Sequence, residues 1–443
     1  MATFERVLTR NVGNPDALTL KGYRQGGGYE GLAKALTMEP EAVVEEVKKS
    51  GLRGRGGAGF FAGMKWGFIP KDKPGEAPKP KYLVANADES EPGTFKDRLL
   101  MEHDPHQLIE GCAICCWAVK AAVCYIYIRG EYTKSAAILE RAIREAYEGG
   151  VLGDSVLGSG FKLDMTVHRG AGAYICGEET GMLESLEGKR GQPRVKPPFP
   201  AVVGAFGAPT VINNVETLAN VPHILTLGAD WFKSIGTDER NTGPKLYAVS
   251  GHVERPGTYE YPCGVTFREI LEGAGGVWKR RELKAFIPGG ASAPILTRAH
   301  IDIKMDFDTV AKAGSMLGSA AVIVMDETTC MVRSVVRLAK FFNHESCGQC
   351  TPCREGTNWM ELVLERLEHG EGSERDAQLL LSICRNIGGQ SLCALGDAAI
   401  GPVKSLVERF PEEIERHVRD RACPFPRPRY FEKSVEKSVQ SGV

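Results

Sequence analysis

The sequence predicts a multidomain α/β protein with a doubly wound, Rossmann-like sheet, a small β-grasp module and a C-terminal helical bundle. Its 443 residues are enough for about three domains. Apolar strands and helical segments alternate between residues 81 and 225, which is typical of a largely parallel sheet. Near residue 245 the pattern changes to a hairpin followed by a helix, and from 327 to 417 apolar residues recur with a helical period.

The first part of the chain is polar and rich in glycine, and we expect it to cap the sheet domain. The elements expected up to residue 187 are, in order, a helix over 40–49 that ends before Gly51, strands over 82–86, 124–128 and 163–168, and helices over 105–121, 135–148 and 181–187. Ligands of such sheets bind at the carboxyl ends of the strands.

Strands over 246–250 and 258–261, a helix over 266–272 and a strand over 283–287 predict the β-grasp module. The apolar period after residue 327 predicts the helical bundle. We therefore divide the chain into an N-terminal cap with a glycine-rich loop (1–66), a Rossmann-like domain (67–238), a β-grasp domain (239–326), a four-helix bundle (327–420) and a flexible tail (421–443).

The composition argues against several partners. Lys and Arg number 55 against 56 Asp and Glu, so no net charge attracts nucleic acid or anionic lipid. Thirteen cysteines and an N-terminus unlike a signal peptide indicate a reducing, cytosolic compartment. The longest apolar segment, from Cys112 to Ile128, is interrupted by Lys120 and is shorter than the roughly 20 residues of a membrane span. We expect membrane association only through partners.

Cys347, Cys350 and Cys353 form a C-x2-C-x2-C run, and Cys393 follows far along the chain. Three cysteines on one loop and a distant fourth suit a [4Fe-4S] cluster, whereas zinc ligands usually come as two separated pairs. A loop whose cysteines merely pack is the alternative, but the residues between them are polar or small. The pattern therefore predicts electron transfer.

The segment from Gly54 to Gly59 reads G-x-G-x-x-G but follows a predicted helix, so the dinucleotide-fold fingerprint fails on context. Glycines such as Gly56 and Gly57 let backbone N–H groups close on an anion, and Arg55 and Lys65 add positive charge. A flexible surface loop is the alternative interpretation. We retain a phosphate or flavin cradle as a hypothesis.

An acidic segment with Asp88, Glu89 and Glu91 follows the strand that ends at Asn86. Carboxylates at a strand end accept hydrogen bonds from ribose hydroxyls in dinucleotide folds. A metal site is the rival, but the segment contains no histidine. We favour nucleotide binding.

A glycine-rich segment from Gly170 to Thr180 follows the strand over 163–168 and opens a helix, so its N–H groups are suited to phosphate or to the polar edge of a flavin. The alternative is that Glu178 and Glu179 only interact favourably with the dipole at the N-terminus of this helix and bind no ligand. The basic, proline-rich loop 189–200 is suited to clamping a pyrophosphate or an adenine, or is simply solvated.

Cys112, Cys115, Cys116 and Cys124 lie in apolar surroundings and are assigned to the core. The other cysteines show no cluster spacing, and the nine histidines form no ligand pair, so the sequence indicates no catalytic metal site. These other cysteines are Cys176, Cys263, Cys330, Cys384 and Cys423.

Four motifs together resemble the NADH-oxidising flavoprotein subunit of respiratory complex I, over about residues 40–420. They are Gly51-Leu-Arg-Gly-Arg-Gly-Gly-Ala-Gly59, Asn86-Ala-Asp-Glu-Ser-Glu-Pro-Gly-Thr-Phe-Lys-Asp97, Gly170-Ala-Gly-Ala-Tyr-Ile-Cys-Gly-Glu-Glu-Thr180 and Glu345-Ser-Cys-Gly-Gln-Cys-Thr-Pro-Cys-Arg-Glu-Gly356. The resemblance implies hydride transfer from NADH to FMN, followed by one-electron transfer to the cluster bound by Cys347, Cys350, Cys353 and Cys393.

The resemblance also implies ligand contacts. FMN would be held by Gly54, Gly56, Gly57, Lys65, Asn86, Asp88, Glu89, Tyr174, Gly177, Glu178, Asn213 and Asn214. Phe60, Phe68 and Phe199, with Lys196 beside them, would hold the adenine of NADH, and Glu91 and Glu179 would position its nicotinamide. The family usually reads Gly-Phe-Pro-Thr-Gly where this chain has Gly59-Phe60-Phe61-Ala62-Gly63, which makes Phe61 a competitor of Phe60.

The implied partners are a thioredoxin-like [2Fe-2S] subunit and a large multi-cluster iron–sulfur subunit. The implied location is the cytoplasmic side of a bacterial inner membrane, reached through the complex. The diaphorase subunit of an NAD-linked hydrogenase or formate dehydrogenase is the rival. A structural zinc or iron–sulfur module without catalysis is the alternative from another class.

Overall fold

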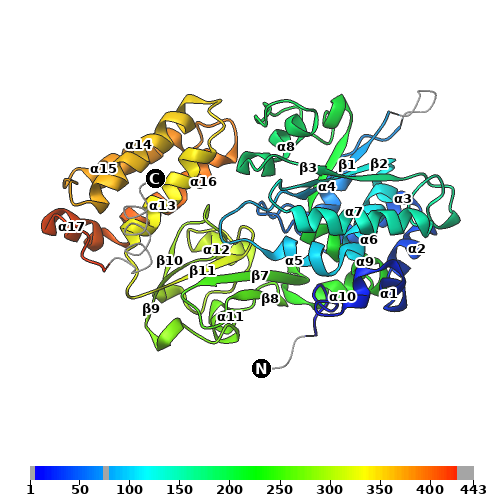
Figure 1. Cartoon of the computed structure of the whole chain (residues 1–443), viewed down its shortest axis with the longest axis horizontal. Helices are drawn as coiled ribbons and strands as arrows, with labels where there is room; N and C mark the ends of the chain where they lie inside the picture. Colours follow the sequence, from blue (N-terminus) through cyan, green and yellow to red (C-terminus); the bar gives the residue numbers. More distant parts are fainter. Residues whose placement is uncertain (1–4, 73–78, 427–443) are drawn as a thin grey trace, which may run out of the picture.

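A parallel four-stranded sheet lies in the N-terminal half of the computed structural model, which describes residues 5–72 and 79–426 (Figure 1). Its strands are β1 (Tyr82–Ala87), β2 (Val123–Ile128), β3 (Asp164–Arg169) and β4 (Thr210–Asn214), in the order β3-β2-β1-β4. All neighbouring strands are parallel. The predicted mixed α/β fold with a parallel sheet is confirmed, and β4 is a strand that the sequence pattern did not indicate.

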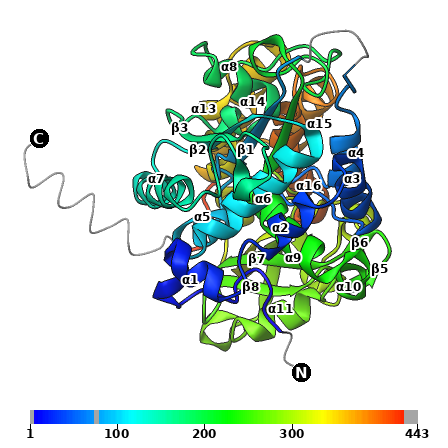
Figure 2. The same cartoon turned by 90° about the vertical axis from the view of Figure 1, so that its right-hand side faces the viewer.

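The helices of this half pack mainly around α6 and α9. They are α1 (Leu20–Gln25), α2 (Glu30–Leu36), α3 (Pro40–Lys49), α4 (Ala62–Gly67), α5 (Lys96–His103), α6 (Pro105–Val119), α7 (Thr133–Glu148), α8 (Glu179–Leu186), α9 (Val215–Leu227) and α10 (Ala229–Ser234). Helices α2 and α3 contact both α6 and α9, on the side of the molecule that faces the viewer in Figure 2. Helices α2 and α3 thus cover the central helices α6 and α9.

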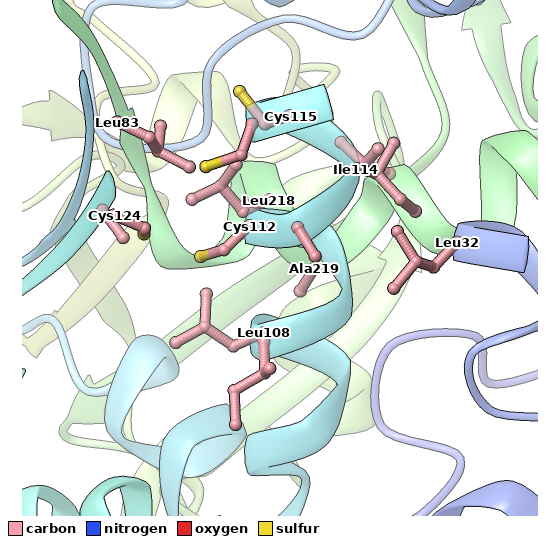
Figure 3. Packing of buried hydrophobic residues seen from close by; sticks show 14 of the residues in the cluster. Leu32, Leu83, Leu108, Cys112, Ile114, Cys115, Cys124, Leu218 and Ala219 are labelled. Atoms are coloured by element: carbon pink, nitrogen blue, oxygen red, sulfur yellow. The ribbon is translucent and has the colours of Figure 1, made fainter. Parts of the chain in front are cut away.

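Helix α6 is apolar on all sides, as expected of a helix that is surrounded by other elements. Cys112 and Cys115 of α6 lie close to Leu218 of α9, Leu83 of β1 and Cys124 of β2 (Figure 3). All three cysteines are fully buried, and Cys116 is buried with them. The assignment of these four thiols to the core is confirmed.

A second, five-stranded sheet follows, with the order β10-β9-β11-β7-β8. The elements of this region are β5 (Gly236–Asp238), β6 (Asn241–Thr242), β7 (Pro244–Gly251), β8 (Gly257–Pro262), α11 (Phe267–Gly273), β9 (Leu283–Ile287), β10 (Leu296–Thr297), α12 (Phe307–Lys312) and β11 (Ala321–Asp326). Helix α11 begins with a capping box in which Thr266 and Glu269 satisfy each other's backbone N–H groups. Phe267 of α11 stacks on Phe286 of β9, which joins the helix to the sheet.

Buried charges connect the two sheets. Lys245 of β7 and Lys96 of α5 both lie against the carboxylate of Glu216, at 3.2 and 2.8 Å, and Glu216 lies in the first turn of α9. All three side chains are almost completely buried. Removing one partner would leave an uncompensated charge in the interior, so this contact fixes how the sheets meet.

The C-terminal region contains five helices among the described residues, rather than the predicted four. They are α13 (Met331–Glu345), α14 (Thr351–Glu368), α15 (Asp376–Ile387), α16 (Ala394–Arg409) and α17 (Pro411–Asp420). The fifth is separate because Phe410 leaves the helical conformation and Pro411, which lacks an N–H, starts a new helix.

The predicted flexible tail also needs correction at its start. Cys423 and Phe425 pack against the bundle, and Arg333 donates hydrogen bonds to both residues. The remainder of that segment, from 427 onward, lies outside the described residues. No helix within residues 5–72 and 79–426 is long and apolar enough to cross a membrane.

Candidate functional site

Polar residues gather where β1 and β4 end. Asn86 of β1 pairs in register with Asn214 of β4, and both strands are parallel, so their carboxyl ends meet at one sheet edge. The Asn86 amide donates to the carbonyl of Gly177 (3.0 Å), and the Asn214 amide donates to Asp97 (2.7 Å). Asn213 accepts a hydrogen bond from the indole of Trp66 (2.7 Å). The structure thus brings the predicted Asn86, Gly177, Asn213 and Asn214 together.

The glycine-rich loop reaches the same edge. A Cβ on Gly56 would lie 2.8 Å from the Cβ of Asn214, so a larger residue would push the loop away from β4. Gly57 has φ +131° and open space beside it. The loop is closed by a hydrogen bond from the Gly54 N–H to the Phe60 carbonyl (2.7 Å). The open space beside Gly57 is what a flavin or phosphate cradle would need from this loop.

Arg55 differs from the expectation that its charge faces a phosphate. Its side chain is fully buried, and its guanidinium donates to the carbonyls of Thr242 (2.7 Å) and Pro244 (3.0 Å). Its backbone N–H donates to the Thr217 hydroxyl. Arg55 therefore anchors the loop to the second sheet, since unpaired carbonyls in that interior would be costly.

Asp88 and Glu89 are buried directly after β1. Burial raises the pKa of Asp88 to about 7, although its hydrogen bond from Ser90 opposes the shift. The Glu89 carboxylate accepts the backbone N–H groups of Asp97 and Arg98, so it caps α5. Burial and the charge of Asp97 nevertheless raise the pKa of Glu89 to about 7. If Glu89 contacts the flavin as predicted, the same carboxylate also caps helix α5.

Glu91 joins three parts of the chain. It accepts hydrogen bonds from the hydroxyl of Tyr174 (2.6 Å) and from both the N–H and the hydroxyl of Ser292 (2.7 Å each). Tyr174 begins the short helix η3 (Tyr174–Gly177), and Ser292 lies in the second sheet region. Burial raises the pKa of Glu91, and these hydrogen bonds oppose that shift.

A compact charge cluster lies at the start of α8. Glu178 caps this helix and pairs with Lys196 (2.8 Å), while Glu179 pairs with Lys65 (2.9 Å) and Lys196 (3.1 Å). Burial opposes ionisation of Glu179, but the two lysines lower its pKa below the usual value. The structure therefore joins the glycine-rich region, α8 and the basic loop through residues that the sequence analysis had selected separately.

Three aromatic rings stand exposed near these loops. Phe60, Phe68 and Phe199 are 47%, 55% and 57% exposed. Phe60 and Phe68 lie 6.0 Å apart between ring centroids. Phe61 is less exposed and packs under Arg53, so Phe60 is the ring of this pair that is free to stack on a ligand.

The four predicted cluster cysteines lie at helix starts or on connections. Cys350 precedes α14, Cys353 is in its first turn, Cys393 precedes α16, and Cys347 lies on the connection after α13. Burial raises the pKa of Cys393 to about 11, with contributions from Cys347 and Cys353 that show their proximity. Burial likewise raises the pKa of Cys353, with contributions from Cys350 and Cys347.

One further observation fits a [4Fe-4S] cluster. Ser391, two residues before Cys393, has a buried hydroxyl with no hydrogen-bond partner among the described residues. Hydrogen bonds to sulfur are a normal feature of such clusters.

Tyr174 connects the sheet edge to the cysteines. Its N–H donates to Glu345 (3.0 Å), which ends α13 two residues before Cys347. Its ring packs edge-on against Phe341 of the same helix, with centroids 5.0 Å apart. The pKa of Tyr174 is raised by burial and then by Glu91, with a smaller contribution from Cys393. The two candidate centres are therefore neighbours.

Two residues at the site were not selected from the sequence. Ser292 and Trp66 each hold a selected residue through a hydrogen bond. Each is distant in sequence from its partner, and neither its residue type nor its spacing marks it out. A serine in a glycine-rich connection or a tryptophan in a short helix is equally typical of ordinary packing.

A sheet-edge cradle beside a four-cysteine centre defines a class of protein, the flavin and iron–sulfur oxidoreductases. The family models agree, since residues 47–223 match the Nuo51 FMN-binding domain, residues 246–296 match the SLBB domain, and residues 333–417 match the NADH-ubiquinone oxidoreductase-F iron-sulfur binding region.

Similar proteins of known name identify the family within this class. The chain is 56% identical to an F-type NADH-quinone oxidoreductase subunit of Rhizobium meliloti, over 95% of its own length and 100% of that protein. It is 54% identical to the F-type NADH-quinone oxidoreductase subunit of Mycobacterium tuberculosis, over 95% of each chain. This chain belongs to the family of F-type NADH-quinone oxidoreductase subunits.

A solved structure gives a more distant comparison. An NAD+-reducing [NiFe]-hydrogenase in the air-oxidized state matches with a TM-score of 0.80 and 34% identity, covering 94% of this chain and 67% of the hydrogenase chain. The lower identity places the hydrogenase further from this chain than the quinone reductase subunits.

Proposed function

We propose that this chain is the NADH-oxidising subunit of a complex I, which takes a hydride from NADH at FMN and passes electrons through its [4Fe-4S] cluster towards quinone. The single observation that carries this order of events is Tyr174, which contacts Glu91 at the sheet edge and Glu345 beside the cluster cysteines. The greater identity to the NADH-quinone oxidoreductase subunits than to the hydrogenase favours this function over a hydrogenase diaphorase.

FMN, when bound, accepts a hydride and releases electrons singly, so the protein's task is to bind, orient and shield the reactants. We assign the flavin to the cradle formed by Gly54, Gly56, Gly57, Lys65, Asn86, Asp88, Glu89, Tyr174, Gly177, Glu178, Asn213 and Asn214. Glu91 and Glu179 then act as positioning groups at the nicotinamide end. We also propose that the negative field of these carboxylates speeds the release of NAD+.

The exposed rings supply the adenine site. Phe60 and Phe68 offer apolar faces for stacking, and Phe199 offers a third close in sequence to Lys196 of the charge cluster. Aromatic surface of this size exposed beside a binding edge is otherwise costly to leave in water. We infer that bound NADH covers it.

We also propose the domain division given from the sequence, with the second sheet as the β-grasp domain. Partners are expected to be a thioredoxin-like [2Fe-2S] subunit and a multi-cluster subunit, on the cytoplasmic side of a bacterial membrane. What supports this is membership of a family whose relatives are named as subunits of an NADH-quinone oxidoreductase.

The test uses the purified full chain loaded with FMN and iron. Replacing Phe60 or Phe68 by Ala should raise KM for NADH by about 5–30-fold while changing kcat much less, because stacking contributes about 1–2 kcal/mol. Phe206→Ala is the matched control, since Phe206 is 53% exposed but packs on Tyr82 at the opposite end of β1. Equal KM values in all variants would count against the adenine site.

A further inference from the structure

A second group of metal-ligand residues lies at the far end of the helical bundle. Cys330, Glu368, His417 and Cys423 place one ligand atom each so that all four lie within 4.8 Å of one another. Cys330 precedes α13 and Glu368 ends α14, whereas Cys347, Cys350 and Cys353 lie where α13 ends and α14 begins. Since α13 has 15 residues and rises about 1.5 Å per residue, the two groups are separate sites.

We propose that these four residues bind one structural Zn²⁺ ion. The Cys330 sulfur lies 3.6 Å from that of Cys423, 3.4 Å from His417 Nε2 and 3.6 Å from Glu368 Oε2, and the last two atoms are 3.6 Å apart. A tetrahedral zinc with bonds of about 2.0–2.3 Å keeps neighbouring ligand atoms about 3.3–3.8 Å apart. The observed separations therefore match the edges of such a tetrahedron.

The remaining polar atoms of these side chains are occupied in ways that orient the ligand atoms. His417 Nδ1 lies 2.6 Å from the carbonyl of Glu413, which leaves Nε2 for the metal. Arg333 donates to Glu368 Oε1 (2.6 Å), so Oε2 faces the sulfurs. Arg333 also donates to Cys423 through its guanidinium and to Cys330 through its backbone N–H. Such donors stabilise thiolates.

Other interpretations of the group fit less well. A Cys330–Cys423 disulfide needs sulfurs about 2.05 Å apart, and these are 3.6 Å apart. Two thiols acting only as small apolar groups would not require a histidine and a carboxylate against them. Cys330, Glu368 and His417 are each at most 7% exposed, so four protein ligands enclose the position, as in structural rather than catalytic zinc sites.

The ion would tie the start of α13, the end of α14, helix α17 and the segment after it into one unit. Two thiolates and one carboxylate against Zn²⁺ and Arg333 leave the site without net charge. The proposal does not depend on the NADH chemistry, because none of these residues contacts the sheet-edge site described above.

The test is metal analysis of the full-length protein purified without chelators from zinc-containing medium. About one zinc per chain is expected besides the iron, with a zinc X-ray absorption spectrum showing two sulfur neighbours near 2.3 Å and two nitrogen or oxygen neighbours near 2.0–2.1 Å. Absence of zinc, or a shell of four sulfurs as the cluster cysteines would give, overturns the proposal.

Cysteine variants test whether the ion is bound at this group of residues. Cys330→Ser combined with Cys423→Ser should lower the zinc content at least fivefold while iron and flavin contents stay unchanged. Cys384→Ser is the matched control, because Cys384 is a buried thiol of the same bundle that lies 3.8 Å from Met360. Zinc retained in the double variant contradicts the proposal. If the double variant does not fold, the absorption spectrum of the wild-type protein still decides.

Discussion

Two sets of four cysteines in this chain differ because of where they lie. Cys112, Cys115, Cys116 and Cys124 are 0% exposed inside α6 and β2, among apolar neighbours. Cys347, Cys350, Cys353 and Cys393 lie on connections and helix starts, where three of them are half-buried. Spacing along a loop therefore separates the proposed cluster ligands from these four packing thiols.

The strongest effect should come from replacing one of the four proposed cluster cysteines, Cys347, Cys350, Cys353 and Cys393. Cys353→Ser removes one proposed cluster ligand and should lower cluster affinity by more than about 100-fold, since changes outside the ligand shell alone cost 10–100-fold. Iron analysis and EPR after NADH addition measure this loss. Flavin bleaching should persist, because no residue of the sheet edge is altered. Cys115→Ser is the control, and loss of iron in that variant would contradict the division into two sets.

The next largest effect is a loss of stability, expected when one of the four buried thiols of α6 and β2 is replaced. Cys115→Ser should lower the free energy of unfolding by about 1–3 kcal/mol, because it buries a hydroxyl that its apolar surroundings cannot satisfy. Burial raises the pKa of the Cys115 thiol, so it should also resist alkylation in the folded protein. Chemical denaturation and mass spectrometry after alkylation provide the measurements. Rapid native alkylation, or wild-type stability, would show that this site is not core.

A smaller effect is expected from Glu91, a carboxylate of the sheet-edge site. Glu91→Gln removes a negative charge from the nicotinamide end of the proposed site and should increase NAD+ affinity by about 2–10-fold, because the proposed role of this charge is to speed NAD+ release. The increase should be greater at alkaline than at acidic pH, because burial raises the pKa of Glu91 and leaves it less ionised in acid. Equilibrium dialysis at several pH values measures it. Unchanged affinities for NADH and NAD+ would contradict the positioning role.

The weakest effect concerns Asp88, whose pKa is raised to about 7 by burial. The folded flavin-free protein then binds this proton more tightly than the unfolded chain, so the stability that it contributes is fully present below pH about 4 and falls as pH rises towards about 7. Asp88→Asn should make the free energy of unfolding less dependent on pH between about 4 and 7. Denaturation curves across that pH range measure this change. An unchanged slope would show that groups other than Asp88 cause the pH dependence of stability.

The sequence predicted local elements better than their assembly. The strand over 283–287 and the helix over 40–49 have the expected bounds, because periodicity and capping act over a few residues. Strand β4 was not predicted because its short run, Thr210–Asn214, lacks a distinctive pattern, and the bundle has one helix more than predicted because α17 is separated from α16 at Phe410. Boundaries set by tertiary contacts carry no such local signal.

The same distinction applies to the site. Glycine and cysteine motifs were visible because their residues are adjacent, whereas Ser292 meets Glu91 only after the two sheets pack together. Arg55 shows the converse error, because a cation in a glycine loop suggested a phosphate while the fold buries it against carbonyls. Cys330 and Cys423 lie on different elements, so their meeting could not be predicted from spacing.

The decisive experiment is an anaerobic titration of the loaded, purified protein with NADH and, separately, with NADPH. Flavin absorbance and the EPR signal of the reduced cluster are followed together. We expect that NADH bleaches the flavin and produces the cluster signal, while NADPH does neither. If neither nucleotide reduces a protein shown to contain FMN and iron, the chain is a binding or scaffold protein and the proposed NADH oxidation is wrong.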